Sequence, residues 1–344
     1  MKNLISKSGM AGSGIMLLLR RALCELRSCR PGAVRRRRLR AGENGYEPIV
    51  SAIVCTYNRE DKLLAAVRSL LEQTGAEYEV IVVNNGKPFC NRVLNELSRV
   101  KIINEGRTGL SRARNAGAAA ARGEYLTFID DDAVAEPGLL ECVRRTFEEH
   151  KKAAVIGGLI LLGSKPPIVL PGYEALWSEF TVPYEKYREV SMQYEFPFGA
   201  NFSVRHSVLD AMGGFDLRYG RTGSDYAGGE ETALCFKALS CGYRIGIQPQ
   251  AVVRHMVDDS RFTREHIRRT LRAGIFTTRR LYIDGYSPYN WDKSYAMRRI
   301  KLAEDEMARL RRGGADELEI YYKECERDGF CALVREIEKE AAQL

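Results

Sequence analysis

Short apolar runs alternate with amphipathic patterns four times between residues 49 and 151. Runs of this length, rich in β-branched residues, predict buried strands, whereas apolar residues at helical spacing predict helices. The predicted strands cover 49–55, 78–83, 101–103 and 125–132, and the predicted helices cover 63–71, 89–98, 109–123 and 137–151. This order predicts an α/β fold with a mostly parallel sheet, helices on both faces and a ligand crevice at the carboxyl ends of the strands.

Local signals predict where the helices begin and end. Asn58 is a candidate N-cap for the first helix, and Gly75 stops that helix. The Ala-rich stretch 109–123 ends at Gly123, which predicts a glycine cap. Its small residues allow close packing against the sheet.

The run 125–132 ends in three consecutive carboxylates, Asp130, Asp131 and Asp132. Adjacent carboxylates in a low-dielectric pocket repel one another, so they need a compensating cation or hydrogen-bond donors. Hard oxygen ligands suit Mg²⁺ or Mn²⁺, which usually arrive with substrate phosphates. A solvated acidic turn is the alternative interpretation of these residues.

Several classes of protein are poorly supported. No G-x-G-x-x-G follows the first strand and no G-x-x-x-x-G-K-[ST] occurs, which argues against nicotinamide enzymes and P-loop NTPases. The nine cysteines are scattered without a C-x-x-C pair, which favours reduced thiols in a cytosolic setting over disulfides or a zinc site.

The excess of positive charge belongs to one terminal segment. Residues 1–40 hold 11 Lys/Arg and one Glu, a net charge of +10. Because the whole chain has a net charge of +8, the remaining residues carry −2. Nucleic-acid binding is therefore not expected. The apolar residues of 12–30 recur at helical spacing, so the segment could lie on an anionic membrane surface. A disordered basic tail, a targeting leader and residues upstream of the true start are the alternatives.

Beyond residue 151 we expect a strand over 153–162, then a Pro- and aromatic-rich span to about residue 197. Its rings could stack on sugars or pack beneath a long loop. Arginines cluster around a helix that ends near Leu281, and they could face an anionic acceptor, lipid headgroups or solvent. Two further helical patterns follow, with a break at Gly313 and Gly314.

A series of short motifs carries a resemblance to a known family. The motifs are Ser51-Ala-Ile-Val-Cys-Thr-Tyr-Asn-Arg59, Gly109-Leu-Ser-Arg-Ala-Arg-Asn-Ala-Gly117, Phe128-Ile-Asp-Asp-Asp132, Phe198-Gly-Ala-Asn201, Gly213-Gly-Phe-Asp216, Gly228-Gly-Glu-Glu231, Gly242-Tyr-Arg-Ile245 and Ala251-Val-Val-Arg-His255. In this order and spacing, over about residues 48–275, the chain resembles the family 2 glycosyltransferases. The resemblance implies a GT-A-type fold, a nucleoside-diphosphate-sugar donor and a metal-dependent, inverting sugar transfer.

By matching position, the resemblance implies that Asp130 holds the ribose of the donor. It implies that Asp132, with Asp131 as a further candidate, binds a Mg²⁺ or Mn²⁺ ion that bridges the diphosphate. His255 resembles a further metal ligand, although a structural histidine on a strand is the alternative. Arg112 or Arg114 could help to stabilise the charge on the leaving diphosphate.

In similar enzymes the second acidic residue of the Glu-Glu pair is the catalytic base, which implies Glu231 as the base and Glu230 as an acceptor-orienting residue. Many relatives have Asp where this chain has Glu231, and the extra methylene changes the geometry of the carboxylate. Two Glu in the first turn of a helix are also common for helix stability alone. The preceding Gly228 and Gly229 favour function, since a glycine loop could close over the donor.

The end of the second strand is a second departure from the family pattern. Asn84 stands where the family usually has Asp, and its amide oxygen can still accept a hydrogen bond from a base. Uridine is therefore the expected base. The neighbouring base-contacting edge is Thr56, Tyr57, Asn58 and Arg59, with a purely structural turn as the alternative.

We therefore expect an enzyme that transfers a sugar from a nucleotide donor, with UDP expected, to a glycan, lipid-linked or other acceptor hydroxyl in cell-surface polysaccharide or glycoconjugate synthesis. A non-catalytic sugar-binding relative and a sugar nucleotidyltransferase are the alternatives. The expected organisation is a leader at 1–46, a glycosyltransferase domain at 47–280 with halves at 47–152 and 153–280, and a helical extension at 281–344. We expect a cytoplasmic protein that could contact the inner face of the membrane.

Overall fold

The computed structural model of the chain describes residues 48–164, 179–192, 195–222 and 228–343. The basic segment 1–46 and three aromatic residues of the long loop, Tyr173, Trp177 and Tyr194, lie outside these residues. Predictions about them are therefore not tested by the fold.

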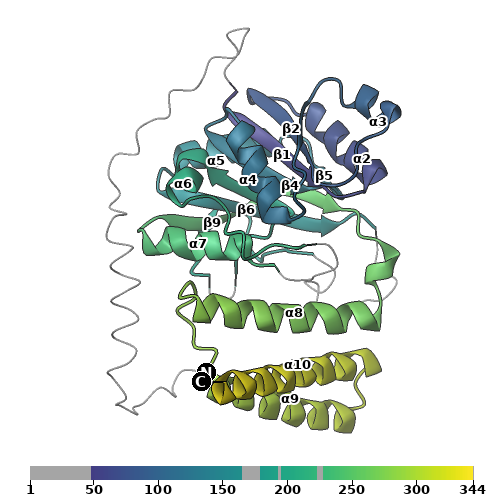
Figure 1. Cartoon of the computed structure of the whole chain (residues 1–344), viewed down its shortest axis with the longest axis vertical. Helices are drawn as coiled ribbons and strands as arrows, with labels where there is room; N and C mark the ends of the chain where they lie inside the picture. The colour runs from purple at the N-terminus through teal and green to yellow at the C-terminus, as the bar shows by residue number, and fades with distance from the viewer. Residues whose placement is uncertain (1–47, 165–178, 193–194, 223–227, 344) are drawn as a thin grey trace.

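The described residues form the strands and helices of an α/β protein (Figure 1). The strands are β1 (Val50–Thr56), β2 (Tyr78–Asn84), β3 (Lys101–Asn104), β4 (Tyr125–Asp130), β5 (Ala133–Ala135), β6 (Ala153–Leu162), β7 (Arg188–Glu189), β8 (Asn201–Arg205) and β9 (Arg244–His255). The helices are α2 (Glu60–Leu71), α3 (Asn91–Glu96), α4 (Leu110–Ala120), α5 (Leu139–Glu149), α6 (His206–Ala211), α7 (Glu230–Ser240), the 3₁₀ helix η2 (Asp259–Arg261), α8 (Arg264–Ile283), α9 (Lys293–Gly313) and α10 (Glu317–Ala342). All the strands and helices predicted from residue 49 onwards are present, and the helical pattern at 12–30 lies outside the described residues.

The strands form one mixed sheet in the order β3-β2-β1-β4-β8-β6-β9-β5, with β7 paired to β9. The four strands of the alternating region are parallel, and β6 and β9 run in the same direction, whereas β8, β5 and β7 run against them. The prediction of a mostly parallel sheet is confirmed. Register places Thr56 opposite Asn84, and Cys55 opposite Asp130, so the predicted site residues share one edge of the sheet.

Alternate residues of β1 bury their side chains on opposite faces of the sheet. Val54 joins the apolar cluster under α2 and α5, whereas Ile53 joins the cluster under α4 and α7. On the α4 side a Cβ at Gly117 would lie 2.6 Å from Cγ2 of Ile53. The Ala-rich helix therefore packs as closely on the sheet as its small residues predicted.

Two predicted caps are wrong. Asn58 does not cap α2: Arg59 occupies the N-cap position, and Asn58 has a positive φ of 56°. Asn58 Oδ1 accepts instead from the backbone N–H of Lys87 over 2.8 Å, so a tertiary partner outcompetes the local one. Gly123 does not cap α4, which ends at Ala120, because Gly123 donates to Ser51 Oγ over 2.9 Å and packs directly on β1.

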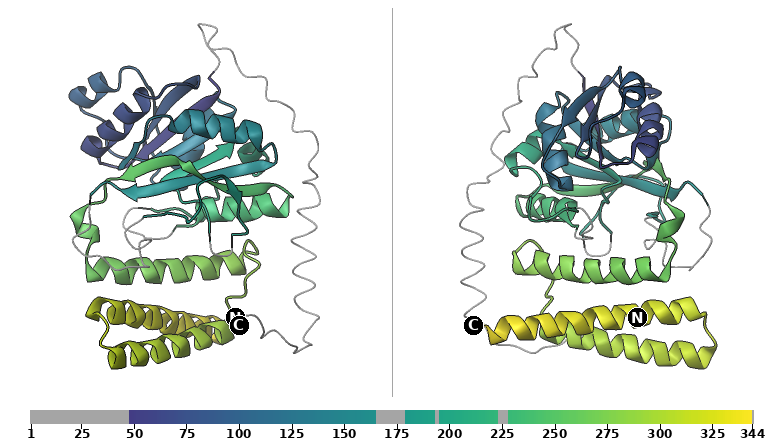
Figure 2. Two further views of the ribbon diagram at one scale, coloured as in Figure 1. Left: turned by 180° about the vertical axis from the view of Figure 1, so that it is seen from behind. Right: turned by 45° about the vertical axis from the view of Figure 1, so that its right-hand side comes forward.

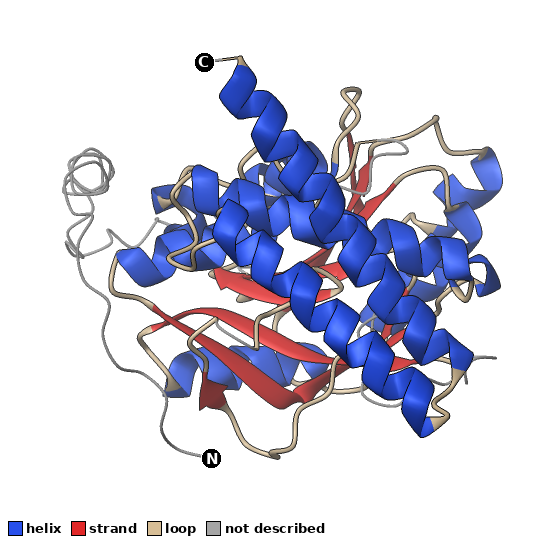
Figure 3. Cartoon of the chain, turned by 90° about the horizontal axis from the view of Figure 1, so that it is seen from below, coloured by secondary structure: helices blue, strands red, loops and turns tan. Residues whose placement is uncertain are grey.

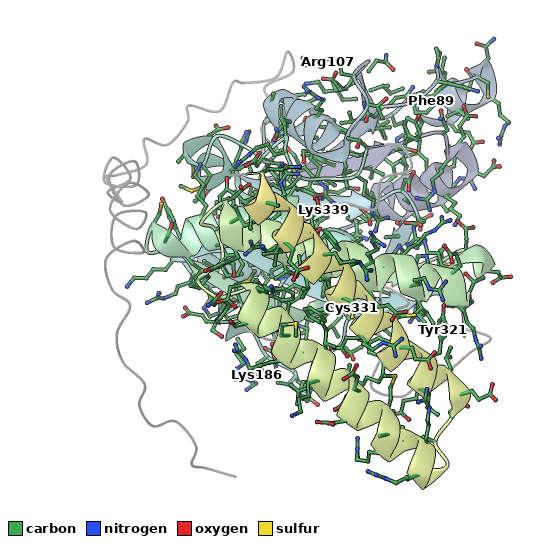
Figure 4. The ribbon with its side chains drawn as sticks, turned by 60° about the horizontal axis from the view of Figure 1, so that its bottom comes forward. Phe89, Arg107, Lys186, Tyr321, Cys331 and Lys339 are labelled. Atoms are coloured by element: carbon green, nitrogen blue, oxygen red, sulfur yellow. The ribbon has the colours of Figure 1, made fainter. Side chains whose placement is uncertain are left out.

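The three C-terminal helices form a layer below the sheet (Figures 1 and 2). Helix α8 lies between the sheet and the antiparallel pair α9 and α10, which crosses the front of the molecule when it is seen from below (Figure 3). Ile275 of α8 shares an apolar cluster with Phe330 and Leu333 of α10. Tyr321, Cys331 and Lys339 mark the course of α10 in Figure 4. No helix within the described ranges has the length and apolar character needed to span a bilayer.

Candidate active site

A cavity of about 440 Å³ opens at the carboxyl ends of β1 and β4. Its lining also draws on the end of β9, the start of α7, η2 and α8. The predicted site residues that line it are Thr56, Tyr57, Arg59, Arg114, Asp130, Asp131, Asp132, Glu230, Glu231 and His255. Asn58, Asn84 and Arg112 are not among its lining residues.

The middle carboxylate of the triplet, Asp131, is held by the end of β1 and the loop that follows. Thr56 Oγ1 donates to Asp131 Oδ2 over 2.7 Å, and Arg59 Nη1 donates to Asp131 Oδ1 over 2.8 Å. Burial raises the pKa of Asp131 to about 6, against the opposing charge of Arg59 and the hydrogen bond from Thr56. Asp131 is thus fixed in place by two donors.

The third carboxylate, Asp132, is buried beside two guanidinium groups and an imidazole ring. Its Oδ1 lies 3.0 Å from His255 Nε2, and its Oδ2 pairs with the guanidinium of Arg59. Arg261 Nη2 lies 3.6 Å from the same Oδ2. Burial alone would raise the pKa of Asp132, but the hydrogen bond with His255 and the nearby positive charges outweigh it and hold this pKa well below its usual range.

Arg114 of α4 connects the acidic triplet to the carboxylate pair at the start of α7. Its Nη1 forms a buried ion pair with Glu230 and lies 3.8 Å from Glu231 Oε2. Its Nη2 lies 3.5 Å from Asp130 Oδ1 and donates to the carbonyl of Gly199 over 3.3 Å. One buried cation therefore faces carboxylates from both clusters.

The two glutamates differ in their surroundings. Burial and the neighbouring carboxylate of Glu231 raise the pKa of Glu230 well above its usual range, against the opposing charge of Arg114. Glu231 Oε2 is buried and accepts no hydrogen bond from any described residue. A buried acceptor that lacks a hydrogen bond costs free energy, so this oxygen is suited to a donor that a ligand brings, such as a hydroxyl group.

Comparison with known proteins identifies the family. The model of "Glycosyl transferase family 2" matches residues 51–213. The glucosyl-dolichyl phosphate glucuronosyltransferase of Haloferax volcanii is 30% identical over 230 residues, which are 62% of this chain and 70% of that protein. The chain belongs to glycosyltransferase family 2.

Solved structures show the same fold. The mannosyltransferase PcManGT from Pyrobaculum calidifontis, in complex with GDP-Man and Mn²⁺, superposes with a TM-score of 0.51 at 19% identity over 79% of this chain and 73% of its own. GalNAc-T7, with UDP, GalNAc and Mn²⁺, also has a TM-score of 0.51 at 15% identity, over 74% of this chain and 51% of its own. The GT-A-type fold of this family 2 glycosyltransferase is therefore confirmed.

The acidic triplet of this glycosyltransferase offers a set of ligands for a metal ion. One ligand atom each from Asp130, Asp132 and His255 lie within 4.8 Å of one another. Two carboxylate oxygens and one imidazole nitrogen suit a divalent cation of the Mn²⁺ type, which accepts oxygen and nitrogen ligands. The residues present therefore fit the predicted metal ion.

Two residues that the sequence analysis did not place in the site, Asn85 and Arg261, line the cavity. Asn84 uses both ends of its amide in a local turn, accepting from Gly86 N over 3.0 Å and donating to the carbonyl of Lys87 over 2.9 Å. The next residue, Asn85, lines the cavity instead and accepts from Gly109 N over 2.8 Å. Arg261 also lines the cavity. The repeated asparagine at the end of β2 was the only signal for Asn85 in the sequence.

Proposed function

We propose that the protein is an inverting glycosyltransferase that moves a sugar from a nucleoside diphosphate to an acceptor hydroxyl with the help of Mg²⁺ or Mn²⁺. One observation carries this proposal: the acidic triplet and the carboxylate pair line the same cavity, and Glu231 Oε2 has no hydrogen-bond donor among the described residues. Transfer needs both an anchor for the diphosphate and a base for the acceptor.

The donor end of the proposed site is the edge formed by β1, β2 and β4. Tyr57 lines the cavity and is 46% exposed, so its ring can stack on the base. Thr56, Asn58, Arg59 and Asn84 belong to the same edge, and Asp130 is the proposed partner of the ribose. Uridine stays the expected base, so UDP-sugars are the first donors to test.

The diphosphate end consists of the triplet and its neighbours. Asp132 and His255 would hold the metal ion, and Asp130 could give it one carboxylate oxygen while the other faces the ribose. The ion would neutralise the charge that develops on the leaving diphosphate. Arg261 lines the cavity beside Asp132 and can donate to phosphate oxygens, while Arg112 stays a candidate for the same task. Asp131 fixes the turn after β4 through hydrogen bonds from Thr56 at the end of β1 and from Arg59 in the loop that follows.

The acceptor end is the start of α7. Glu231 accepts the proton of the attacking hydroxyl, which approaches the anomeric carbon from the face opposite the diphosphate, so that the configuration inverts. Glu230 is tied to Arg114 and holds its neighbour in position. The longer side chain of Glu231, where many relatives have Asp, extends the carboxylate from the helix terminus into the cavity.

Glycan and lipid-linked acceptors are the proposed acceptor classes, and polysaccharide or glycoconjugate synthesis is the proposed context. The relative from Haloferax volcanii is named for a glucosyl-dolichyl phosphate, and ExoO of Rhizobium meliloti, 28% identical over 257 residues, is named for succinoglycan biosynthesis. These relatives support the class of acceptor.

The test compares wild type with Glu231→Gln, which removes the base and keeps the shape. With Mn²⁺ and a panel of UDP- and GDP-sugars, wild type should release nucleoside diphosphate, and the variant should be slower by about 10²- to 10⁴-fold, the usual contribution of general base catalysis. Mn²⁺-dependent thermal stabilisation by the same donor should persist in the variant, because donor binding does not use Glu231. Equal rates of release would exclude Glu231 as the base.

A further inference from the structure

Arg59 occupies an unusual position for a residue at the start of a helix. Its two terminal nitrogens pair with different carboxylates, Nη1 with Asp131 over 2.8 Å and Nη2 with Asp132. Asp132 is also one of the three residues whose ligand atoms cluster tightly enough to hold a metal ion. The guanidinium and a metal ion at Asp132 therefore compete for one carboxylate.

The charges around the triplet affect how tightly a metal ion can bind at Asp132 without a diphosphate. Two guanidiniums already face Asp132: Nη2 of Arg59 pairs with its Oδ2, and Nη2 of Arg261 lies 3.6 Å from the same oxygen. A divalent cation at Asp132 would meet both positive charges at close range in a largely buried setting, where like charges repel strongly. A diphosphate that arrives with the cation would supply negative charge that offsets this repulsion.

Arg59 also has an alternative carboxylate partner, Asp258. Its side chain is 32% exposed, and its Nη2 lies 4.0 Å from Asp258 Oδ2, on the solvent side of the triplet. Asp258 is half exposed and is already paired with Lys62 over 2.7 Å. A small rotation would move the guanidinium from Asp132 towards Asp258 and leave its bond to Asp131 in place.

We propose that the guanidinium of Arg59, which is held by Asp131, stays beside Asp132 until a nucleoside diphosphate binds. The metal ion alone therefore binds weakly, and the metal ion and the diphosphate bind together. The inference rests on the proposed role of Asp132 as a metal ligand. It assigns to Arg59 a task different from contact with the base, which the sequence predicted. Arg59 thereby sets the affinity of the enzyme for its metal ion.

The decisive measurement is binding of Mn²⁺ alone to the full chain, followed by calorimetry and by the paramagnetic resonance of free Mn²⁺. Arg59→Gln should bind Mn²⁺ about tenfold more tightly than wild type or better, because one competing and repelling charge is gone. Arg59→Lys should be intermediate, since an ammonium cannot bridge two carboxylates as a guanidinium does. Unchanged or weaker Mn²⁺ binding by Arg59→Gln would overturn the inference.

Saturating UDP or GDP provides the second measurement. Either nucleotide should tighten Mn²⁺ binding more in wild type than in Arg59→Gln, because only wild type has a cation to displace. Equal tightening would contradict the proposal. The matched control is Arg311→Gln, which removes the same charge from an exposed ion pair with Glu324 on the C-terminal helices and should leave Mn²⁺ affinity unchanged.

A double variant shows where the metal ion binds. The double variant Arg59→Gln with Asp132→Asn should lose the tighter Mn²⁺ binding. If the double variant kept it, the ion would bind elsewhere and the inference would be wrong. These outcomes are independent of catalysis. Loss of the Glu231 effect on donor release would instead contradict the proposed function while Mn²⁺ binding stayed as predicted.

Discussion

At the scale of single residues, Arg114 is the buried cation that faces carboxylates from both clusters of the site. It is 3% exposed, and it faces Glu230, Glu231 and Asp130 while its guanidinium lies 5.6 Å from the ring centre of Phe215. A buried ion pair adds little net stability, but removal of one partner leaves the others charged and unpaired. The carboxylate pair therefore depends on this one cation.

We expect Arg114→Gln to lower the free energy of unfolding by about 3–5 kcal/mol, the usual cost of breaking a buried ion pair. Urea denaturation measures the change. Arg112→Gln is the matched control on the same helix, two residues away, because Arg112 has no ion pair among the described residues. Its effect should stay within about 0.5 kcal/mol. Equal effects of the two substitutions would contradict the central role of Arg114.

At the scale of secondary structure, the register between β1 and its neighbours builds the site. Because β2 and β4 both run parallel to β1, their carboxyl ends reach the same edge as Thr56. Helix α4 then brings Arg114 beneath that edge, and it can do so because Gly117 lets the helix approach Ile53 and Val83. The position of the cation thus depends on a glycine one turn away.

Two glycine substitutions in helices test this packing. Gly117→Ala would place a Cβ 2.6 Å from Ile53 Cγ2 and 3.0 Å from Val83 Cγ2, so overpacking by about 1–3 kcal/mol should outweigh the gain in helix propensity. Gly274→Ala on α8 meets no atom within 4 Å and should stabilise by about 0.5–1 kcal/mol. Thermal denaturation distinguishes the two signs. Stabilisation by both would mean that α4 can move away from the sheet.

At the scale of the whole molecule, the C-terminal helices are a second layer that packs on the first through α8. Ile275 of α8 contacts the cluster of Phe330 and Leu333, and a Cβ at Gly329 would lie 2.6 Å from Ile275 Cδ1. Helix α8 also contributes Thr270 to the cavity. We therefore propose that the boundary expected at residue 280 separates two parts that fold together.

Phe330→Ala tests this coupling. Phe330 is 2% exposed and stacks on Trp291 with ring centres 5.7 Å apart, so its loss should cost about 3–5 kcal/mol. Tryptophan fluorescence in a Trp177→Phe background, which leaves Trp291, reports the helical layer, and circular dichroism reports the whole chain. Both should lose stability together in one transition, in the variant as in wild type. An earlier fluorescence transition would mean that the helical layer unfolds independently.

The sequence by itself determined the alternating order of strands and helices, the family and the acidic triplet. These depend on local periodicity and on motifs of adjacent residues, which the chain order preserves. Even the two wrong caps, Asn58 and Gly123, were predicted from local rules that a distant partner overrode.

Only the tertiary structure decided which polar side chains meet. Residues 114 and 230 are far apart in the chain, and their ion pair forms because α4 and α7 reach the same strand ends. The choice of Arg114 over Arg112, and of Asn85 over Asn84 at the cavity, follows from which side of a helix or strand end faces inward. Sequence spacing alone does not fix that direction, because it depends on packing against elements that arrive from elsewhere in the chain.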